Sequence, residues 1–299
     1  MIRLLIIILT LIELGFSQKA FVGMNTWTHS QTVGLTGGGY LFSTQNEFRN
    51  PAMLTKSNRY FKINMIKYPA QINGQSLMTN GKWNKHYFGL KLNRINYGFF
   101  EGRNSNNQVE DDYSAAETHL KLVYAKFSNS ERFAIGITSG LFFSSIDNVN
   151  ANALTISPGA VFFSRFGQLG VSLQNSGLTL NSYTKKKAKL PSSIVTSLAG
   201  KIEKMPLELE VDHSYSLIDQ QSVFIFSGLL HLRNRLIIKG GTSTNKFDQI
   251  TSEKDNAISR RVLSFSVQTW SDERHCVQYV AQKAKCHISN SDQGVRDFR

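Results

Sequence analysis

From about residue 58 onward, apolar and polar residues alternate along the chain in short segments of roughly 8–11 residues. The clearest segment places Leu207, Leu209 and Val211 between Glu208, Glu210 and Asp212. Because successive side chains of a strand point to opposite faces, each segment has one apolar face and one polar or small face. Turns rich in Gly, Asn, Ser and Lys separate the segments and leave no room for helices, which makes a parallel βαβ sheet unlikely.

The pattern therefore predicts an all-β chain of about fourteen strands, the last of them in the tail. Besides 207–212, the predicted segments are 60–68, 74–83, 88–93, 94–101, 119–124, 133–138, 157–164, 169–174, 193–202, 222–232, 235–243 and 260–270. The longest polar gaps, 102–116 and 244–259, are predicted loops. No linker divides the strands into two domains.

The first seventeen residues have the features of an export signal. Arg3 supplies a positive start, and the apolar run 4–16 is too short for a membrane span, which needs about 20 residues. Gly15 and Ser17 are small residues suited to cleavage before Gln18, although Glu13 interrupts the apolar run. We expect residues 1–17 to be removed. The alternative is a buried N-terminal strand or helix.

The net charge of +13 would suit a protein that binds nucleic acid or another anionic partner. An exported chain rarely meets nucleic acid, so anionic lipid head groups or acidic glycans are the more natural partners. The basic run Lys185–Lys187 with Lys189 is read as a solvated loop. Two cysteines exclude a disulfide-built scaffold. After the signal there is no apolar stretch long enough for a membrane helix.

Alternation alone fits both a soluble β-sandwich and a transmembrane β-barrel. Three observations favour the barrel: the export signal, segment lengths close to the 9–11 residues (roughly) of a membrane-crossing strand, and aromatic residues at segment ends, where barrels carry interfacial girdles. Those aromatic residues are Tyr60, Tyr68, Trp83, Tyr87, Tyr97, Phe99, Phe162 and Phe166.

Several short motifs resemble those of a known family. Residues 38–54 read GGYLFSTQNEFRNPAML, which resembles the start of the PorV/PorQ group of FadL-like outer-membrane barrels, and later stretches sharpen the match towards its PorQ branch. These stretches are 95–100 (INYGFF), 113–117 (YSAAE), 173–177 (LQNSG) and 189–191 (KLP). The resemblance covers roughly residues 20–245, and the order and spacing of the motifs give it its weight.

The resemblance implies a transmembrane antiparallel β-barrel of about 14 strands with a short N-terminal segment in its lumen. On this interpretation residues 18–57 form the plug, 58–270 the barrel and 271–299 an atypical tail. Family members of this kind serve type IX protein secretion and the anchoring of surface attachment components, without enzymatic activity. The motif residues Gly38, Gly39, Asn50, Pro51 and Ala52 are then structural, with Asn50-Pro51 as a turn in the plug.

The tail departs from the family pattern, since residues 271–299 are polar and poorly periodic, and both cysteines lie there. His275-Cys276 and Cys286-His287 are a ligand set that suits zinc, but at an unusual spacing. If residues 277–285 form one strand, the two pairs lie too far apart to share a site. A disulfide is the likelier bond, and two free thiols are the leading interpretation. We predict no metal and no cofactor.

Four further groups suggest chemistry but have simpler explanations. Asp212-His213-Ser214 contains the residue types of a catalytic triad, yet strand neighbours point to opposite faces. Glu110–Asp112 is read as a solvated acidic loop. Glu208 and Glu210 share one strand face and would point into a barrel lumen with Asp212. Gly37–Gly39 lacks the residues of a phosphate loop.

Two other functions stay open. A FadL-like transporter of hydrophobic solutes would need an apolar lumen, whereas the predicted lumen faces are polar or small. An exported soluble β-sandwich would bind a ligand or glycan, or hydrolyse it with Glu208 and Glu210.

Overall fold

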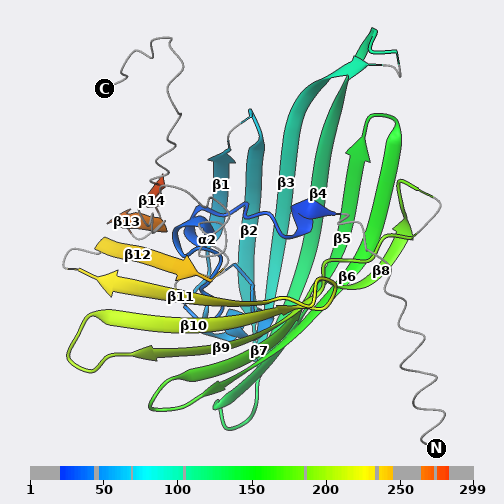
Figure 1. Ribbon diagram of the computed structural model, residues 1–299. Helices are drawn as coiled ribbons and strands as arrows, with labels where there is room; N and C mark the ends of the chain where they lie inside the picture. The colour runs from blue at the N-terminus through cyan, green and yellow to red at the C-terminus, as the bar shows by residue number, and fades with distance from the viewer. Residues whose placement is uncertain are drawn as a thin grey trace, which may run out of the picture.

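The computed structural model describes residues 21–43, 47–68, 70–103, 106–184, 187–232 and 236–244, and the strand backbone of 264–272 and 275–282. The predicted all-β class is confirmed: one large antiparallel sheet dominates the described chain (Figure 1). Its strands are β1 (Phe61–Lys67), β2 (Asn73–Trp83), β3 (His86–Arg103), β4 (Val109–Phe127), β5 (Phe133–Ile146), β6 (Val149–Phe163), β7 (Gln168–Gln174), β8 (Ser176–Asn181), β9 (Ser193–Lys201), β10 (Leu207–Ser216), β11 (Ser222–His231), β12 (Leu236–Ser243), β13 (Ser264–Asp272) and β14 (His275–Gln282).

The strands follow one another in chain order across the sheet, with one exception. β7 and β8 pair with successive parts of β6 and are separated by Asn175, whose φ is 48°. β7 and β8 together occupy one position in the strand order, so the described sheet is thirteen strands wide, whereas the sequence predicts about fourteen. Within the described residues β1 and β14 do not pair with each other, so closure into a barrel is not observed.

The largest error in the predicted strands concerns residues 88–116. The two segments predicted at 88–93 and 94–101 form the single long strand β3. The predicted loop 102–116 is mostly strand, and the acidic residues Glu110–Asp112 lie in β4 rather than in a loop. The outer part of this hairpin extends beyond the apolar part of the sheet, where strand pairing does not require apolar side chains on one face. Backbone pairing of β3 with β4 continues there, with register shifts near Gly98 and Gly102.

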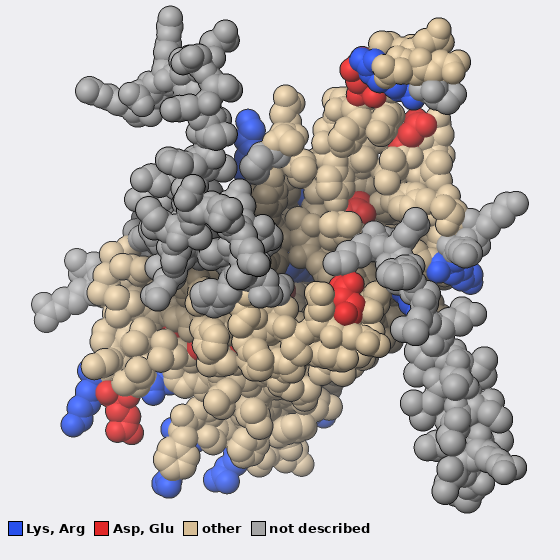
Figure 2. All heavy atoms as spheres, in the orientation of Figure 1, with Lys and Arg blue, Asp and Glu red and all other residues tan. Residues whose placement is uncertain are grey.

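The two faces of the sheet differ in polarity. The inner face, defined here as the face covered by residues 21–56, carries buried polar and small side chains such as Ser76, Thr138 and Ser197. The outer face is apolar and uncovered: Ile135 and Leu198 are 54% and 60% exposed. In Figure 2 the charged side chains gather mostly near the strand ends.

Residues 21–43 and 47–56, called the N-terminal segment here, cross the inner face, and the sheet curves around them (Figure 1). They contain the short helices η1 (Val22–Met24), α2 (Ser30–Gly34) and η2 (Pro51–Lys56). η2 lies against β3 to β6, and α2 lies near β1 and β12 to β14. Whether this segment is the plug of a closed barrel stays a prediction, as does the division at residues 57 and 270.

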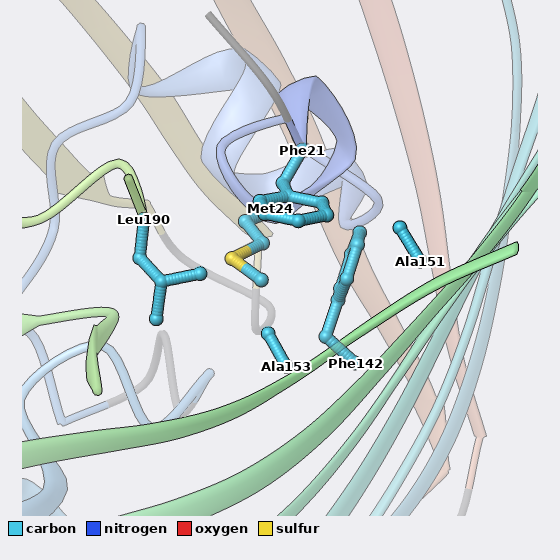
Figure 3. Close-up of a cluster of buried hydrophobic side chains, with 6 residues drawn as sticks. All are labelled: Phe21, Met24, Phe142, Ala151, Ala153 and Leu190. Carbon is cyan, nitrogen blue, oxygen red and sulfur yellow. The ribbon is translucent and has the colours of Figure 1, made fainter. Parts of the chain in front are cut away.

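Small hydrophobic clusters fix this segment to the sheet. Phe21 and Met24 pack against Phe142 of β5 and Leu190, together with two alanines of β6 (Figure 3). The rings of Phe21 and Phe142 meet edge to face with centroids 5.5 Å apart. A second cluster joins Leu41 and Ala52 to β5, β6 and β9. The core of the molecule is therefore the contact between the N-terminal segment and the inner face.

None of the helices in the described ranges is long and apolar enough to cross a membrane.

Candidate functional site

Asn50 fastens the Asn50-Pro51-Ala52 motif to the sheet. Its side-chain oxygen accepts a hydrogen bond of 3.1 Å from the backbone N–H of Ala52 and so caps η2. Its Nδ2 donates to the carbonyl oxygens of Ala160 and Val171, each at 3.2 Å. The pair Asn50-Pro51 is therefore a helix start rather than the simple turn that the sequence predicts. The extended ψ of 113° at Asn50 is the conformation expected before proline.

Three glycines leave room for this motif on β5, β6 and β7. A Cβ at Gly136 would lie 2.6 Å from the backbone nitrogen of Ala52. A Cβ at Gly159 would clash with the amide oxygen of Asn50 and lie 2.7 Å from Cδ of Pro51. A Cβ at Gly170 would lie 2.5 Å from Leu41. The backbone of the N-terminal segment thus approaches the sheet at a distance that only glycine permits.

The other motif residues, Gly38 and Gly39, lie against two buried acids of β10. The backbone N–H of Gly39 donates to Asp212 at 3.2 Å, and that of Leu41 donates to Glu210 at 2.9 Å. A Cβ at Gly38 would clash with the hydroxyl of Ser227. Gly39 has a φ of 88°, which favours glycine. The two carboxyl groups therefore hold the N-terminal segment in place.

Glu47 gathers polar groups in the interior. Its carboxylate lies 2.9 Å from Nδ1 of His29 and 3.6 Å from Nζ of Lys91, and it accepts the hydroxyl of Thr32. Nδ1 of His29 also lies 3.3 Å from the backbone nitrogen of Gln31. Because Nδ1 is closer to Glu47, we assign the ring proton to Nδ1, which donates it to the Glu47 carboxylate.

The two acid–base partners titrate away from their usual ranges. Burial raises the pKa of Glu47, but the interactions of the carboxylate with His29 and Lys91 outweigh burial and hold the pKa below its usual value. Burial lowers the pKa of His29 more than Glu47 raises it, so the imidazole is neutral at pH 7. Glu47 therefore stays ionised inside the protein.

A cavity of about 500 Å³ lies beside this group, between the N-terminal segment and the inner face. Its lining includes Trp27, Tyr40, Arg49, Lys91 and Lys121. Hydroxyl and amide side chains supply much of the rest: Asn25, Thr28, Asn93, Gln174, Asn175, Ser193, Ser214 and Ser216. The cavity is polar and carries several basic groups.

Sequence reasoning did not identify His29, Glu47, Arg49, Lys91 or Lys121 as site residues. A usable signal existed for the two lysines, since both lie on the polar face of an alternating segment. In the sheet Lys91 and Lys121 are direct partners on β3 and β4. Like charges in opposed positions repel each other, and such a pair is a reason to look for a binding site.

The sequence groups that suggested catalysis are not assembled into catalytic arrangements. Asp212 is buried and accepts a hydrogen bond from the hydroxyl of Ser197, while the His213 ring lies tilted against Phe224 of the neighbouring strand, with ring centroids 4.7 Å apart. Glu208 forms an ion pair with Lys201 at 2.9 Å, whereas the buried Glu210 accepts a hydrogen bond from the backbone N–H of Leu41.

Within the described ranges no three His, Cys, Asp or Glu side chains are placed to hold a metal ion.

Several predicted features fall outside the described residues. These are the signal 1–17, Lys185 and Lys186 of the basic run, and Cys286 with His287. His275 and Cys276 begin strand β14, of which only the backbone is described. The zinc, disulfide and free-thiol alternatives therefore stay predictions.

The chain matches no known protein-family model, and no curated protein is significantly similar to it in sequence.

Proposed function

We propose that the protein is an integral outer-membrane β-barrel without enzymatic activity, acting in type IX secretion and the anchoring of surface attachment components. The membrane part of this proposal is carried by one observation: the sheet has its apolar face exposed and its polar face buried. The secretion part rests on the motif resemblance to the PorV/PorQ family.

The size of the exposed apolar face supports a membrane location. Fully burying one Leu, Ile or Phe side chain contributes about 1.5–3 kcal/mol, and soluble monomers rarely expose apolar patches beyond a few hundred Å². Here exposed apolar residues run along β3 to β11, for example Leu122, Ile137, Leu154, Val171 and Phe226. Lipid is the solvent in which this arrangement is favourable.

Exposed aromatic residues mark one end of the sheet. Trp83 ends β2, Phe133 begins β5, Phe162 lies at the end of β6, and Phe166 lies in the turn that follows. Because neighbouring strands are antiparallel, the turns beside these four residues meet at the same end of the sheet. Aromatic side chains at one level of a barrel suit the boundary between lipid and water.

The competing functions fit less well. A soluble sandwich needs a second sheet over the apolar face, but every described strand belongs to the one sheet. A transporter of hydrophobic solutes needs an apolar interior, whereas the cavity described above is lined largely by polar side chains.

The membrane proposal is tested by fractionation and gel migration. We expect the protein to stay in the membrane pellet after carbonate extraction. We also expect the unboiled sample to migrate differently from the boiled one on a detergent gel, as closed barrels do. Release into the carbonate supernatant would contradict the proposal.

The secretion role needs a separate test. Deleting the gene is expected to reduce export or surface attachment of secreted cargo, measured by comparing the secretomes of the two strains. Restoring the intact gene should restore the cargo. Unchanged export and attachment, with the protein confirmed in the membrane, would leave the barrel but remove its secretion role.

A further inference from the structure

The cavity is lined by three basic residues, Arg49, Lys91 and Lys121, and by two acids, Glu47 and Asp219, so the basic groups are in excess. Lys91 is 3.6 Å from the Glu47 carboxylate and also donates to the backbone oxygen of Glu47 at 3.4 Å. Lys121 lies directly opposite Lys91 on β4, yet its Nζ has neither an ion-pair nor a hydrogen-bond partner in the described part of the chain. Glu47 carries one negative charge beside the two positive charges of Lys91 and Lys121, so it does not neutralise both lysines.

Arg49 is a second basic group without a carboxylate partner in the described ranges. Its guanidinium lies 4.1 Å from the centroid of the Tyr40 ring and donates to the Tyr40 hydroxyl at 2.5 Å. Gln174 holds the Arg49 backbone oxygen at 2.8 Å. These contacts fix the guanidinium in the cavity wall without cancelling its charge, which prepares it to meet an anion.

Unpartnered amide groups in the same wall point to a second kind of recognition. Asn175 is only 4% exposed, and its Nδ2 donates to Asn25 at 3.1 Å, while its Oδ1 is buried without a hydrogen-bond partner among the described residues. Oδ1 of Asn93 is likewise buried, and no described group donates to it. An unsatisfied buried acceptor costs about 1–3 kcal/mol. A ligand hydroxyl that donates to either oxygen removes this penalty.

The cavity has a suitable size and wall for such a ligand. Its volume of about 500 Å³ falls within the range of small-molecule pockets, roughly 300–1,000 Å³. The indole of Trp27 and the ring of Tyr40 lie in the wall, where flat rings can cover a sugar face. The wall has more polar than apolar surface, and Ser193 and Ser214 are among its hydroxyl groups, which favours a hydrophilic ligand over an alkyl chain.

We propose that this cavity binds a small hydrophilic anion that also carries hydroxyl groups, such as a sugar phosphate or a sugar acid. Arg49 and Lys121 bind the anionic group, and Asn93 and Asn175 accept its hydroxyls. The binding is independent of the secretion role, because it is measured on the isolated protein.

The test is isothermal titration of the purified full chain in detergent with glucose 6-phosphate and with glucuronate. We expect at least one of these anions to bind, and the tighter one identifies the phosphoryl or the carboxylate group as the preferred anion. Neutral glucose is expected to bind at least about tenfold more weakly. Added salt should weaken anion binding, since it screens the charges. Laurate tests the amphiphile alternative and should not compete.

Variants connect the binding to these residues. Lys121→Met should lower the affinity at least about tenfold, and Asn175→Asp should lower it too because it adds a negative charge. Lys121→Arg should retain binding. The matched control is Lys189→Met, which removes the same charge from an exposed loop position and should change nothing.

Heat-dependent gel migration checks that each variant is folded. If Lys121→Met does not fold, the affinity of Asn175→Asp for the anion tests the proposal instead. Three results would overturn the proposal: no binding of either anion at millimolar concentration, equal binding of glucose, or displacement by laurate. Unchanged affinity in folded Lys121→Met would do so as well.

Discussion

The amide oxygen of Asn50 occupies the space that a side chain at Gly159 would need. The two residues are 109 positions apart in the chain, and their contact places the start of η2 on strand β6. Asn50 also bonds the carbonyl oxygens of Ala160 and Val171, so the same amide links the N-terminal segment to β6 and β7. The attachment of the N-terminal segment depends on this fit.

Gly159→Ala is the first test of this fit. The added Cβ would collide with Asn50 and Pro51, and overpacking of this kind costs about 1–3 kcal/mol. We expect a lower temperature for the heat-dependent shift in gel migration and faster tryptic cleavage within residues 21–56. Gly81→Ala is the control, because nothing lies within 4 Å of the position that a Cβ would take there. Equal stability of the two variants would contradict the described contact.

Removing the Asn50 side chain should also destabilise the protein. Asn50→Ala loses a helix cap, worth about 1 kcal/mol. It also loses two partly buried hydrogen bonds to the carbonyl oxygens of Ala160 and Val171, each worth about 0.5–1.5 kcal/mol. Asn50→Asp keeps the cap but loses the donor and should fall between Asn50→Ala and the unchanged protein. Thermal midpoints in detergent measure the order, and a fully stable Asn50→Ala would show that the bonds contribute nothing.

The free energy of unfolding should fall in acid, because the folded and the unfolded chain protonate Glu47 and His29 at different pH values. The pKa of Glu47 is lowered on folding, so its contribution is present above about pH 4.5, its unfolded value, and is lost as the pH falls below it. The pKa of His29 is lowered as well, so the unfolded chain takes up this proton first and stability also falls below about pH 6.5.

Glu47→Gln separates these two contributions. It should remove the loss of stability below about pH 4.5 and lower the thermal midpoint at pH 7, because Lys91 then lacks its counter-charge. Thermal midpoints at pH 7, 5 and 3 provide the measurement. Glu203→Gln, at an exposed position, should reproduce the wild-type profile. A wild-type profile in Glu47→Gln would contradict the assignment.

The exposed apolar face can be probed with one charge at two depths. Ile137→Lys places an ammonium group in the middle of the apolar stretch of β5, which costs about 2–4 kcal/mol in the centre of a bilayer. Ile146→Lys, at the end of the same strand, should cost no more than about 1 kcal/mol. Folding yields into lipid vesicles compare them. Equal yields, or a soluble Ile137→Lys protein, would favour water as the solvent of this face.

The alternation of the sequence was enough to predict the all-β class and the faces of most strands. Leu209 and Val211 lie exposed on one side of β10, with Glu210 and Asp212 buried on the other, as the pattern predicts. This is possible because the two-residue period is a property of each strand alone. Local patterns did not predict β8, since the break at Asn175 depends on how β6 pairs with both parts.

The candidate site was within reach of the sequence only in part. The motif containing Gly38 and Asn50 could be recognised, but its partners lie on distant strands. Only the register of β3 against β4 places Lys91 opposite Lys121, and only the path of residues 21–56 brings Glu47 to one of them. The sequence by itself determined which residues are polar and on which face they lie. The tertiary structure decided which charges meet, because burial and distance set their interaction.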